Sequence, residues 1–221
     1  MKNFLTSCLL VLPLFVFANA NASLISLGNG LVYDDALDIT WLADANYAKT
    51  SGYDADGIMS WDAANNWALG LSYGGSDNWR LPTAYNQDGT GPCYHPAACT
   101  DSEMGHLFYI DLGGTQGSSI YLSTDPDLAL FSNIITSELI PTGRKYDTYW
   151  TSTDGWSGRK YYFAFTNGSQ WAKNQDDPGG HDWGVAWAVH DGRLNQGIPE
   201  PQTLLLFGAG LSALILSRRK L

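Results

Sequence analysis

Residues 160–172, with the sequence KYYFAFTNGSQWA, have the pattern of a β-hairpin. Aromatic residues alternate along the first part, which places them on one face of a strand over residues 160–166; they are Tyr161, Phe163 and Phe165. Asn167-Gly168 follows, a dipeptide typical of tight hairpin turns, and residues 169–172 supply the returning strand. The pattern predicts an antiparallel sheet in the second half of the chain.

Two more segments of the second half have strand patterns, residues 148–152 and 184–190. In the latter, Val185, Trp187 and Val189 alternate and are expected to share one face of a single strand. Together with the hairpin, these segments predict a second half that is rich in antiparallel strands.

The first half favours two helices after a strand pair at residues 31–33 and 39–42. One amphipathic helix is expected over residues 60–71, behind a Ser60 cap, and a second over residues 103–111, capped by Asp101 or Ser102. Helices grouped early and antiparallel strands late predict an α+β fold with two early helices and a strand-rich second half.

The N-terminus has the composition of a targeting segment. Lys2 precedes an apolar run over residues 4–17, and small residues follow at Ala18, Ala20 and Ala22. This order is typical of a secretory signal peptide, so we assign residues 1–22 to one. A buried N-terminal helix is the alternative.

The C-terminus combines a Pro-Glu-Pro spacer, an apolar segment over residues 203–216 and a basic end. The residues that define the spacer and the basic end are Pro199, Glu200, Pro201, Arg218 and Arg219. Residues 203–217 would form about 22 Å of helix, less than the roughly 30 Å of a bilayer core. The basic end favours the cytoplasmic side, which leaves the preceding chain outside the cytoplasm.

These three elements in this order resemble the PEP-CTERM sorting signal of Gram-negative bacteria, over residues 199–221. The resemblance implies an exosortase as partner, which recognises the tail at the inner membrane and removes it during export. It also implies a final location at the cell surface or in the extracellular matrix, often in association with exopolysaccharide. A plain single-span membrane anchor is the alternative.

Residues 23–198 are left between the two ends and suit one domain. The whole chain has a formal net charge of −10. The two ends carry four basic residues and one acidic residue, so the part between them has a charge of −13. Such a charge opposes binding to nucleic acid and attracts divalent cations.

Cysteine usage predicts a disulfide. Cys8 leaves with the signal peptide, so Cys93 and Cys99 are an even pair in an exported chain. A metal pair completed by His95 is the alternative, although the spacing supplies no fourth ligand for a closed zinc site.

Three blocks of sequence resemble the Lcl C-terminal domain family, at residues 79–83, 149–153 and 186–189. The first block, Trp-Arg-Leu-Pro-Thr, also occurs in formylglycine-generating enzymes. The resemblance implies a single C-type-lectin-like domain. Those families often follow this block directly with a Glu-rich helix start, whereas here residues 84–100 intervene before Glu103.

The residues of the first block also have a structural interpretation. Alternation places Trp79 and Leu81 on one side of a strand that Pro82 ends, and Arg80 is expected to pair with a carboxylate. Thr83 is a candidate cap for the segment that follows. We therefore expect this block to form a corner of the core, with a ligand site as the alternative.

No catalytic residue is predicted. Formylglycine-generating enzymes use two cysteines late in the chain, and no cysteine follows Cys99 here. The four histidines lack the spacing of metal hydrolases, and no Gly-x-Ser-x-Gly motif occurs. We therefore expect a protein that is not an enzyme, with a carbohydrate-active enzyme as the alternative.

Residues 167–190 mix aromatic side chains with Asn, Gln and Asp, which is typical of a surface that binds sugars. The candidate ligand-binding residues are Trp171, Asn174, Asp176, Asp177, Asp182 and Trp183. Gln170 belongs to the same mixture. We expect a glycan-binding domain without a cofactor, and the alternative is a structural matrix protein without a ligand.

Calcium is a second hypothesis for this loop, because its aspartates could supply oxygen ligands. A weaker calcium signal is Asp54-Ala55-Asp56-Gly57, which lacks the closing Glu of an EF-hand. The alternative for all of these aspartates is that they are solvated acids of turns.

Overall fold

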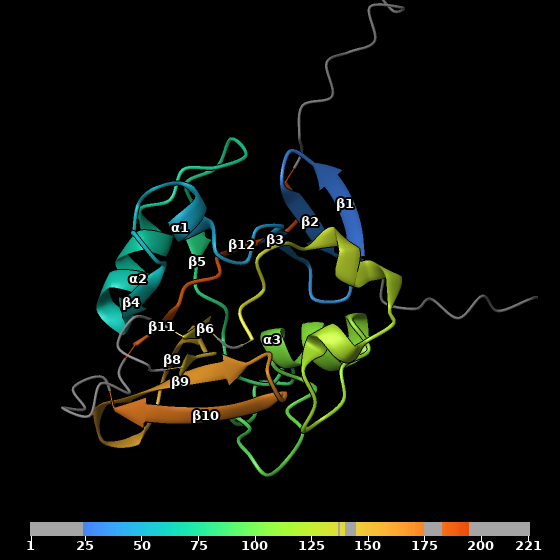
Figure 1. Ribbon diagram of the computed structural model, residues 1–221, viewed down its shortest axis with the longest axis vertical. Helices are drawn as coiled ribbons and strands as arrows, with labels where there is room; N and C mark the ends of the chain where they lie inside the picture. The colour runs from blue at the N-terminus through green and yellow to red at the C-terminus, as the bar shows by residue number, and fades with distance from the viewer. Residues whose placement is uncertain (1–23, 137, 140–144, 175–182, 195–221) are drawn as a thin grey trace, which may run out of the picture.

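Two five-stranded β-sheets form the framework of the chain in the computed structural model (Figure 1). The structure describes residues 24–136, 138–139, 145–174 and 183–194. The predicted signal peptide and the predicted sorting segment both lie outside these residues. No helix in the described ranges is long and apolar enough to cross a membrane.

The first sheet is antiparallel and combines strands from both ends of the described chain. Its order is β1 (Leu24–Gly28), β2 (Leu31–Asp34), β3 (Ile39–Leu42), β12 (Val189–Asp191) and β5 (Trp79–Arg80). The predicted strand pair is confirmed as β2 and β3, in which Tyr33 lies opposite Thr40. Because β12 lies between β3 and β5, this sheet forms only after most of the chain is present.

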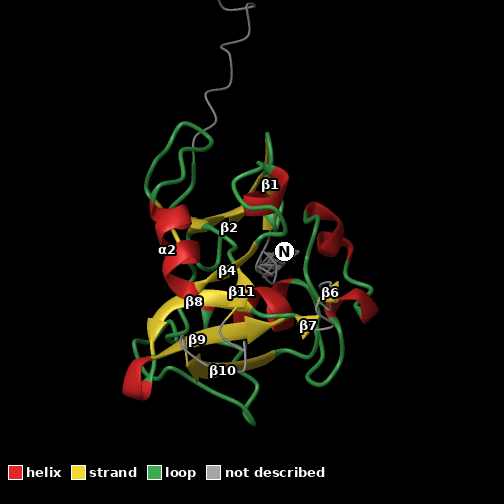
Figure 2. Ribbon diagram, turned by 60° about the vertical axis from the view of Figure 1, so that its left-hand side comes forward, coloured by secondary structure: helices red, strands yellow, loops and turns green. Residues whose placement is uncertain are grey.

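The second sheet is built around the predicted hairpin (Figure 2). Its order is β10 (Ser169–Asn174), β9 (Arg159–Ala164), β8 (Tyr149–Asp154), β11 (Trp183–Val185) and β4 (Ile58–Ser60). The turn is longer than predicted, because Ser169 pairs with Ala164 and the strand ends two residues early. The pair β8 and β11 is parallel, so the expectation of only antiparallel strands is wrong at that position.

Short helical segments connect and cover the sheets. They are α1 (Tyr47–Thr50), α2 (Trp61–Leu69), α3 (Glu103–His106), the π-helical turn η1 (Leu107–Asp111), and the 3₁₀ turns η2 (Ile120–Leu122), η3 (Pro126–Leu130) and η4 (Trp156–Gly158). Strands β6 (Glu138–Leu139) and β7 (Lys145–Tyr146) form a separate pair.

Both predicted helices are present, and their caps are identified. The Ser60 hydroxyl accepts a hydrogen bond from the Ala63 amide at the start of α2. The Ser102 hydroxyl accepts one from the Gly105 amide at the start of α3, so Ser102 is the cap and Asp101 is not. The second helix continues to Asp111 as predicted, but its last turn widens into η1.

The strand predicted over residues 184–190 is two strands. Strand β11 belongs to the second sheet and β12 to the first, and the chain crosses between them through residues 186–188. Ala186 and Ala188 are as fully buried as Val185, Trp187 and Val189. The segment therefore has no solvent-facing side. The alternation of Val, Trp and Val does not mark a buried and an exposed face here, because a segment that crosses the core is buried on every side.

Trp187 occupies the centre of the core where the two sheets meet. Its ring lies 5.2 Å from that of Trp41, 5.3 Å from that of Phe131 and 5.4 Å from that of Tyr149. The Trp187 indole N–H donates to the Leu42 carbonyl oxygen at 2.7 Å, which satisfies its polar atom. One core therefore spans both sheets.

The architecture is mixed α+β, with most of the regular structure in strands, so the predicted fold class is confirmed at that level. The expected segregation of helices and strands is wrong, because residues 24–80 contribute five strands. The short strand β4 was missed because three residues show no measurable alternation, whereas the strand predicted at Trp79 is present as β5.

Candidate functional site

A hollow of about 280 Å³ lies on the hairpin of β9 and β10. Its lining residues are His95, Tyr162, Asn167, Ser169 and Trp171. Tyr162 and Trp171 are direct partners across the two strands, so their rings are neighbours on one face of the sheet. The hollow therefore combines two aromatic side chains with three polar ones.

Two further aromatic residues extend this surface. The ring of Tyr94 lies 5.2 Å from that of Trp171, and the ring of Trp156 lies 6.1 Å from it, both edge-to-face. Tyr94 is 51% exposed and Trp156 is 46% exposed. We call Tyr94, Trp156, Tyr162 and Trp171 the hairpin aromatic face. Exposed rings held by one another form a preordered apolar surface.

Polar groups of the hollow are fixed by local hydrogen bonds. Asn167 Oδ1 accepts from the amide of Ser169 at 3.0 Å and from its hydroxyl at 2.7 Å. This arrangement leaves Asn167 Nδ2 as the donor that a ligand would meet. Burial raises the pKa of Tyr162, and the charge of Asp147 raises it further, so its phenol stays protonated at neutral pH.

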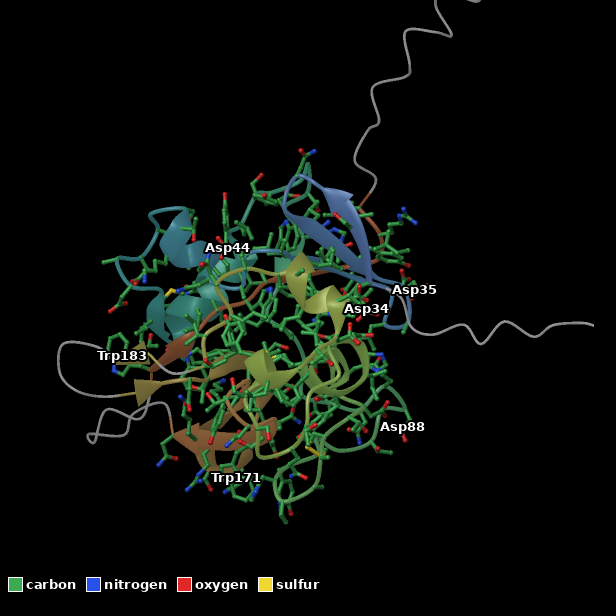
Figure 3. The ribbon with its side chains drawn as sticks, turned by 45° about the vertical axis from the view of Figure 1, so that its right-hand side comes forward. Asp34, Asp35, Asp44, Asp88, Trp171 and Trp183 are labelled. Atoms are coloured by element: carbon green, nitrogen blue, oxygen red, sulfur yellow. A yellow bond between two sulfur atoms is a disulfide. The ribbon has the colours of Figure 1, made fainter. Side chains whose placement is uncertain are left out.

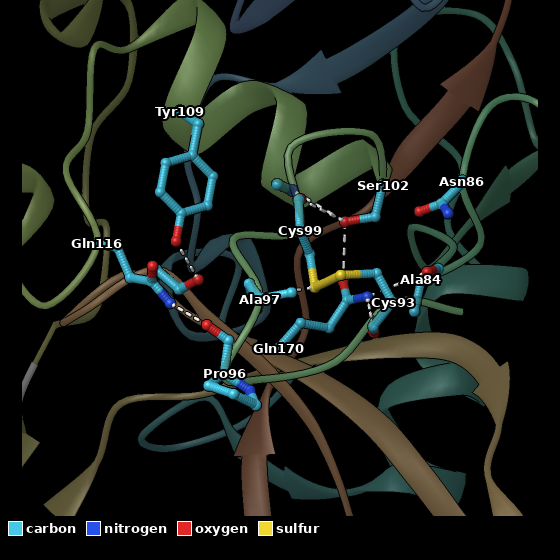
Figure 4. Close-up of a disulfide and its surroundings, with 12 residues drawn as sticks. Ala84, Asn86, Cys93, Pro96, Ala97, Cys99, Ser102, Tyr109, Gln116 and Gln170 are labelled. Carbon is cyan, nitrogen blue, oxygen red and sulfur yellow. Dashed lines mark hydrogen bonds between the residues drawn. A yellow bond between two sulfur atoms is a disulfide. The ribbon is translucent and has the colours of Figure 1, made fainter. Parts of the chain in front are cut away.

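The predicted disulfide between Cys93 and Cys99 is confirmed, with the two Cα atoms 5.5 Å apart (Figure 4). Both thiols are consumed by the bond, so the alternative of a metal pair with His95 is wrong. The disulfide loop also docks on β10, because the His95 amide donates to the Gln170 carbonyl oxygen at 2.8 Å. This contact holds His95 at the edge of the hollow.

Gln170 anchors the disulfide loop through its side chain (Figure 4). Its Nε2 donates to the carbonyl oxygens of Cys93, at 2.8 Å, and Ala84, at 3.0 Å, and its Oε1 accepts from the Ser102 hydroxyl at 2.8 Å. The residue is fully buried. The expectation that Gln170 contributes to a ligand surface is therefore wrong, and its role is to fix the loop.

Cationic side chains lie over aromatic rings on the second sheet. Lys173 Nζ is 4.3 Å from the ring centre of Trp150 and 5.0 Å from that of Tyr162. Lys160 Nζ is 3.5 Å from the ring centre of Trp61. Lys173 therefore places positive charge beside Tyr162 of the hairpin aromatic face, whereas Lys160 forms an ion pair with Asp154.

The structure separates the predicted ligand-binding residues. Trp171 lines the hollow, whereas Trp183 lies at the start of β11, with β8 and β9 in between (Figure 3). Asn174 is exposed at the end of β10, opposite Arg159. The remaining predicted residues, Asp176, Asp177 and Asp182, lie outside the described residues. Tyr162 and His95 could not be predicted as neighbours of Trp171, because only strand pairing and the docked disulfide loop bring them there.

The Trp-Arg-Leu-Pro-Thr block is a corner of the core, as predicted. Trp79 and Leu81 are buried. The Arg80 guanidinium donates to both carboxylate oxygens of Glu103, at 2.7 and 2.9 Å. The Thr83 amide also donates to Glu103, at 2.7 Å, so residues 84–100 loop out and the chain returns to the corner. The Thr83 hydroxyl oxygen accepts a hydrogen bond from the Tyr85 amide at 3.2 Å, so Thr83 caps the start of the following segment, which is a loop and not a helix.

Arg80 also donates to Asp191 on β12, which joins the corner to the first sheet. Burial lowers the pKa of Arg80, but hydrogen bonds to Glu103 and the negative charges of Glu103 and Asp191 outweigh it and raise the pKa. The guanidinium therefore stays charged and balances the buried Glu103 carboxylate.

The weak calcium motif at residues 54–57 has a structural explanation. Asp54 Oδ1 accepts hydrogen bonds from the amides of Asp56 and Gly57, and Asp56 Oδ1 accepts one from the amide of Ile58. These carboxylates stabilise a turn, which favours the interpretation as turn acids.

One group of three potential metal ligands occurs among the residues that the structure describes. It consists of Asp34, His106 and Asp111. These residues come from β2, α3 and η1 and share no motif, so no sequence pattern predicts a ligand role for them. Only the packing of α3 and η1 near the end of β2 brings them together.

The PEP-CTERM protein-sorting motif matches residues 197–220 of the chain. The matched segment contains the predicted Pro-Glu-Pro spacer and both predicted arginines. The motif indicates an exported protein that an exosortase sorts, with transit through the membrane to the cell surface. No curated protein and no solved structure matches the chain.

Proposed function

We propose that the exported domain binds a glycan at the hairpin aromatic face. The observation that carries this proposal is the hollow in which Tyr162 and Trp171 lie side by side with Asn167, Ser169 and His95 at its edge. Aromatic faces pack against the C–H faces of sugar rings, and polar side chains beside them bond the hydroxyl groups. We also propose that the domain has the C-type-lectin-like architecture that the Lcl resemblance implies.

Positive charge supports an acidic glycan as the ligand. Lys173 lies over Tyr162, and the Arg159 guanidinium lies 5.3 Å from the ring centre of Trp156. These cations lie beside the hairpin aromatic face, although the chain as a whole is acidic. A carboxylate-bearing exopolysaccharide would therefore meet Lys173 and Arg159 here, with Asp147 as the opposing negative charge near Tyr162, and the surrounding acidic surface would disfavour its binding elsewhere.

A binding role without catalysis fits the lining of the hollow. Glycoside hydrolysis commonly requires two carboxyl groups on either side of the scissile bond. The residues that line this hollow in the described part of the chain include no carboxylate. Their aromatic, amide and hydroxyl groups are suited to hold a sugar ring in place.

Binding of the full exported chain to an array of neutral and acidic glycans tests the proposal. We expect Trp171→Ala to lower affinity at least tenfold, because a stacked aromatic contributes about 1 kcal/mol or more beyond its buried area. Trp183→Ala is the matched control, since Trp183 is 42% exposed on the same sheet but outside the hollow. Thermal unfolding of both variants checks that each is folded.

The possible results separate the alternatives. Absence of binding to every glycan supports a structural matrix protein. Loss of binding with Trp183→Ala alone moves the site to β11. Loss of glycan binding when calcium is chelated, together with unchanged binding by Trp171→Ala, favours the calcium-binding hypothesis. Turnover of a glycoside supports the enzyme alternative.

A further inference from the structure

Two buried carboxylates and one imidazole converge near the end of β2. Asp34 is the last residue of β2, His106 ends α3 and Asp111 ends η1. One ligand atom from each lies within 4.8 Å of the other two. His106 Nε2 is 3.6 Å from Asp111 Oδ1, which is longer than a good hydrogen bond. Asp34 lies on a different part of the domain from Trp171 (Figure 3).

The polar atoms of this cluster are poorly satisfied in the described structure. Asp34 Oδ2, His106 Nε2 and both carboxylate oxygens of Asp111 are buried without a hydrogen bond of good geometry, and the nearest polar contacts are those of the Trp41 indole with Asp34 and of Asp34 with Asp111. The side chain of Asp111 is 1% exposed. A buried carboxylate without a partner is costly, so four orphaned atoms around one point indicate that something binds between them.

No lysine or arginine of the described residues forms an ion pair with Asp34 or Asp111, and the basic group beside Asp111 is His106. Two carboxyl groups therefore share one buried site, and a bound cation would compensate their charge.

The π-helical turn is the local device that assembles the site. In an α-helix, residues five apart point about 140° away from each other around the axis. In η1 the Leu112 amide instead bonds the Leu107 carbonyl oxygen, five residues back, at 3.0 Å. This wider turn brings Asp111 nearly above His106. Single π turns occur frequently at functional sites.

We propose that Asp34, His106 and Asp111 bind a divalent transition-metal ion, for which Zn²⁺ and Mn²⁺ are the probes. An imidazole nitrogen in the ligand set favours these ions over Ca²⁺, which prefers oxygen ligands. Metal bonds of about 2.1 Å at tetrahedral angles hold ligand atoms about 3.4 Å apart. The 3.6 Å between His106 and Asp111 is close to this spacing.

The ion has a structural role, because its ligands join three separate elements. It links the end of the second strand of the first sheet to the end of α3 and of η1. Nothing in this proposal depends on glycan binding, and the two sites can fail independently.

Elemental analysis and thermal unfolding of the full exported chain test the proposal. We expect about one equivalent of metal per chain, a lower melting temperature after chelation, and recovery with Zn²⁺ or Mn²⁺ but not with Ca²⁺. Asp111→Asn and His106→Gln should each lower Zn²⁺ affinity at least a hundredfold and abolish the response to the chelator. Asp34 is less suitable, because its Oδ1 also accepts from the amides of Ala36 and Leu37.

Asp35→Asn is the matched control, because Asp35 is exposed and adjacent to the cluster. It removes the same charge and should keep the metal. The proposal is overturned if the wild-type chain contains no metal, does not respond to the chelator, and is no more stable than Asp111→Asn. That result would show that Asp34 and Asp111 share a proton. Retention of one equivalent by both Asp111→Asn and His106→Gln would also overturn it, because the ion would then lie elsewhere.

Discussion

The segment formed by α3 and η1 has one buried carboxylate at each end, and the two carboxylates differ in their hydrogen-bond partners. Glu103 at the first end is 5% exposed and receives hydrogen bonds from Arg80 and from the Thr83 amide. Asp111 at the other end is 5% exposed as a whole residue, and its carboxylate has no arginine, lysine or backbone amide as a hydrogen-bond partner among the described residues. Similar burial therefore has different consequences, because only the first end has an arginine of the chain beside its carboxylate.

The difference distinguishes a structural ion pair from a binding site. Arg80 and Glu103 neutralise each other, so this end is complete without a ligand. Asp111 and Asp34 have no arginine or lysine beside them among the described residues, and we propose that a bound cation completes this end. A buried carboxylate is informative about binding only after its partners have been counted.

Arg80→Ala is expected to cause the largest loss of unfolding free energy, because it removes the cation that pairs with Glu103. It leaves Glu103 buried without its cation, which costs about 3–5 kcal/mol of unfolding free energy. Urea unfolding measures this loss. Asp191→Asn is the control, because its side chain is 75% exposed and its pair with Arg80 contributes less than about 1 kcal/mol. Similar losses for both variants would show that the corner is not held by Glu103.

The comparison is sharpened by neutralising each carboxylate in chelated protein. Glu103→Gln removes charge-assisted hydrogen bonds and should cost about 1.5–3 kcal/mol. Asp111→Asn removes a carboxylate that has no partner and should be neutral or stabilising once the metal is gone. Urea unfolding in the presence of a chelator gives both values. A large loss for Asp111→Asn under these conditions would contradict the distinction.

Ser102→Ala is expected to cause a smaller loss of stability than Arg80→Ala or Glu103→Gln, and it tests whether the two ends are independent. The Ser102 hydroxyl caps α3 and donates to Gln170, so its loss should cost about 1–2 kcal/mol. The variant should retain metal at the other end. Its free-energy change should add to that of Asp111→Asn within about 0.5 kcal/mol. Loss of metal from Ser102→Ala would indicate that the ends are coupled.

Local patterns predicted the elements whose signals lie within a few residues. The cap and spacing of α2, the β9–β10 hairpin and the Cys93–Cys99 pair were all confirmed. The burial of the Trp79 corner was confirmed as well. Each of these depends on hydrophobic alternation, on helix capping or on the pairing of cysteines in an exported chain, and short stretches of sequence indicate all three.

Contacts between distant segments could not be predicted. The crossing from β11 to β12 had the same alternation as a single strand, and the partners of Arg80 could have been any of many carboxylates. The hollow required Tyr162 beside Trp171 and His95 on a docked loop. Pairing register and loop docking are set by the whole fold, so no local pattern reports them.

The amino-acid sequence by itself determined where the protein goes and what its local elements are. A sorting motif is recognised as a linear segment, and caps, turns and alternation act over a few residues. Only the tertiary structure decided which buried charges are balanced. Glu103 forms an ion pair with Arg80, whereas Asp34, His106 and Asp111 lie close to one another. The physical reason is that charge compensation depends on distances in space, which packing sets.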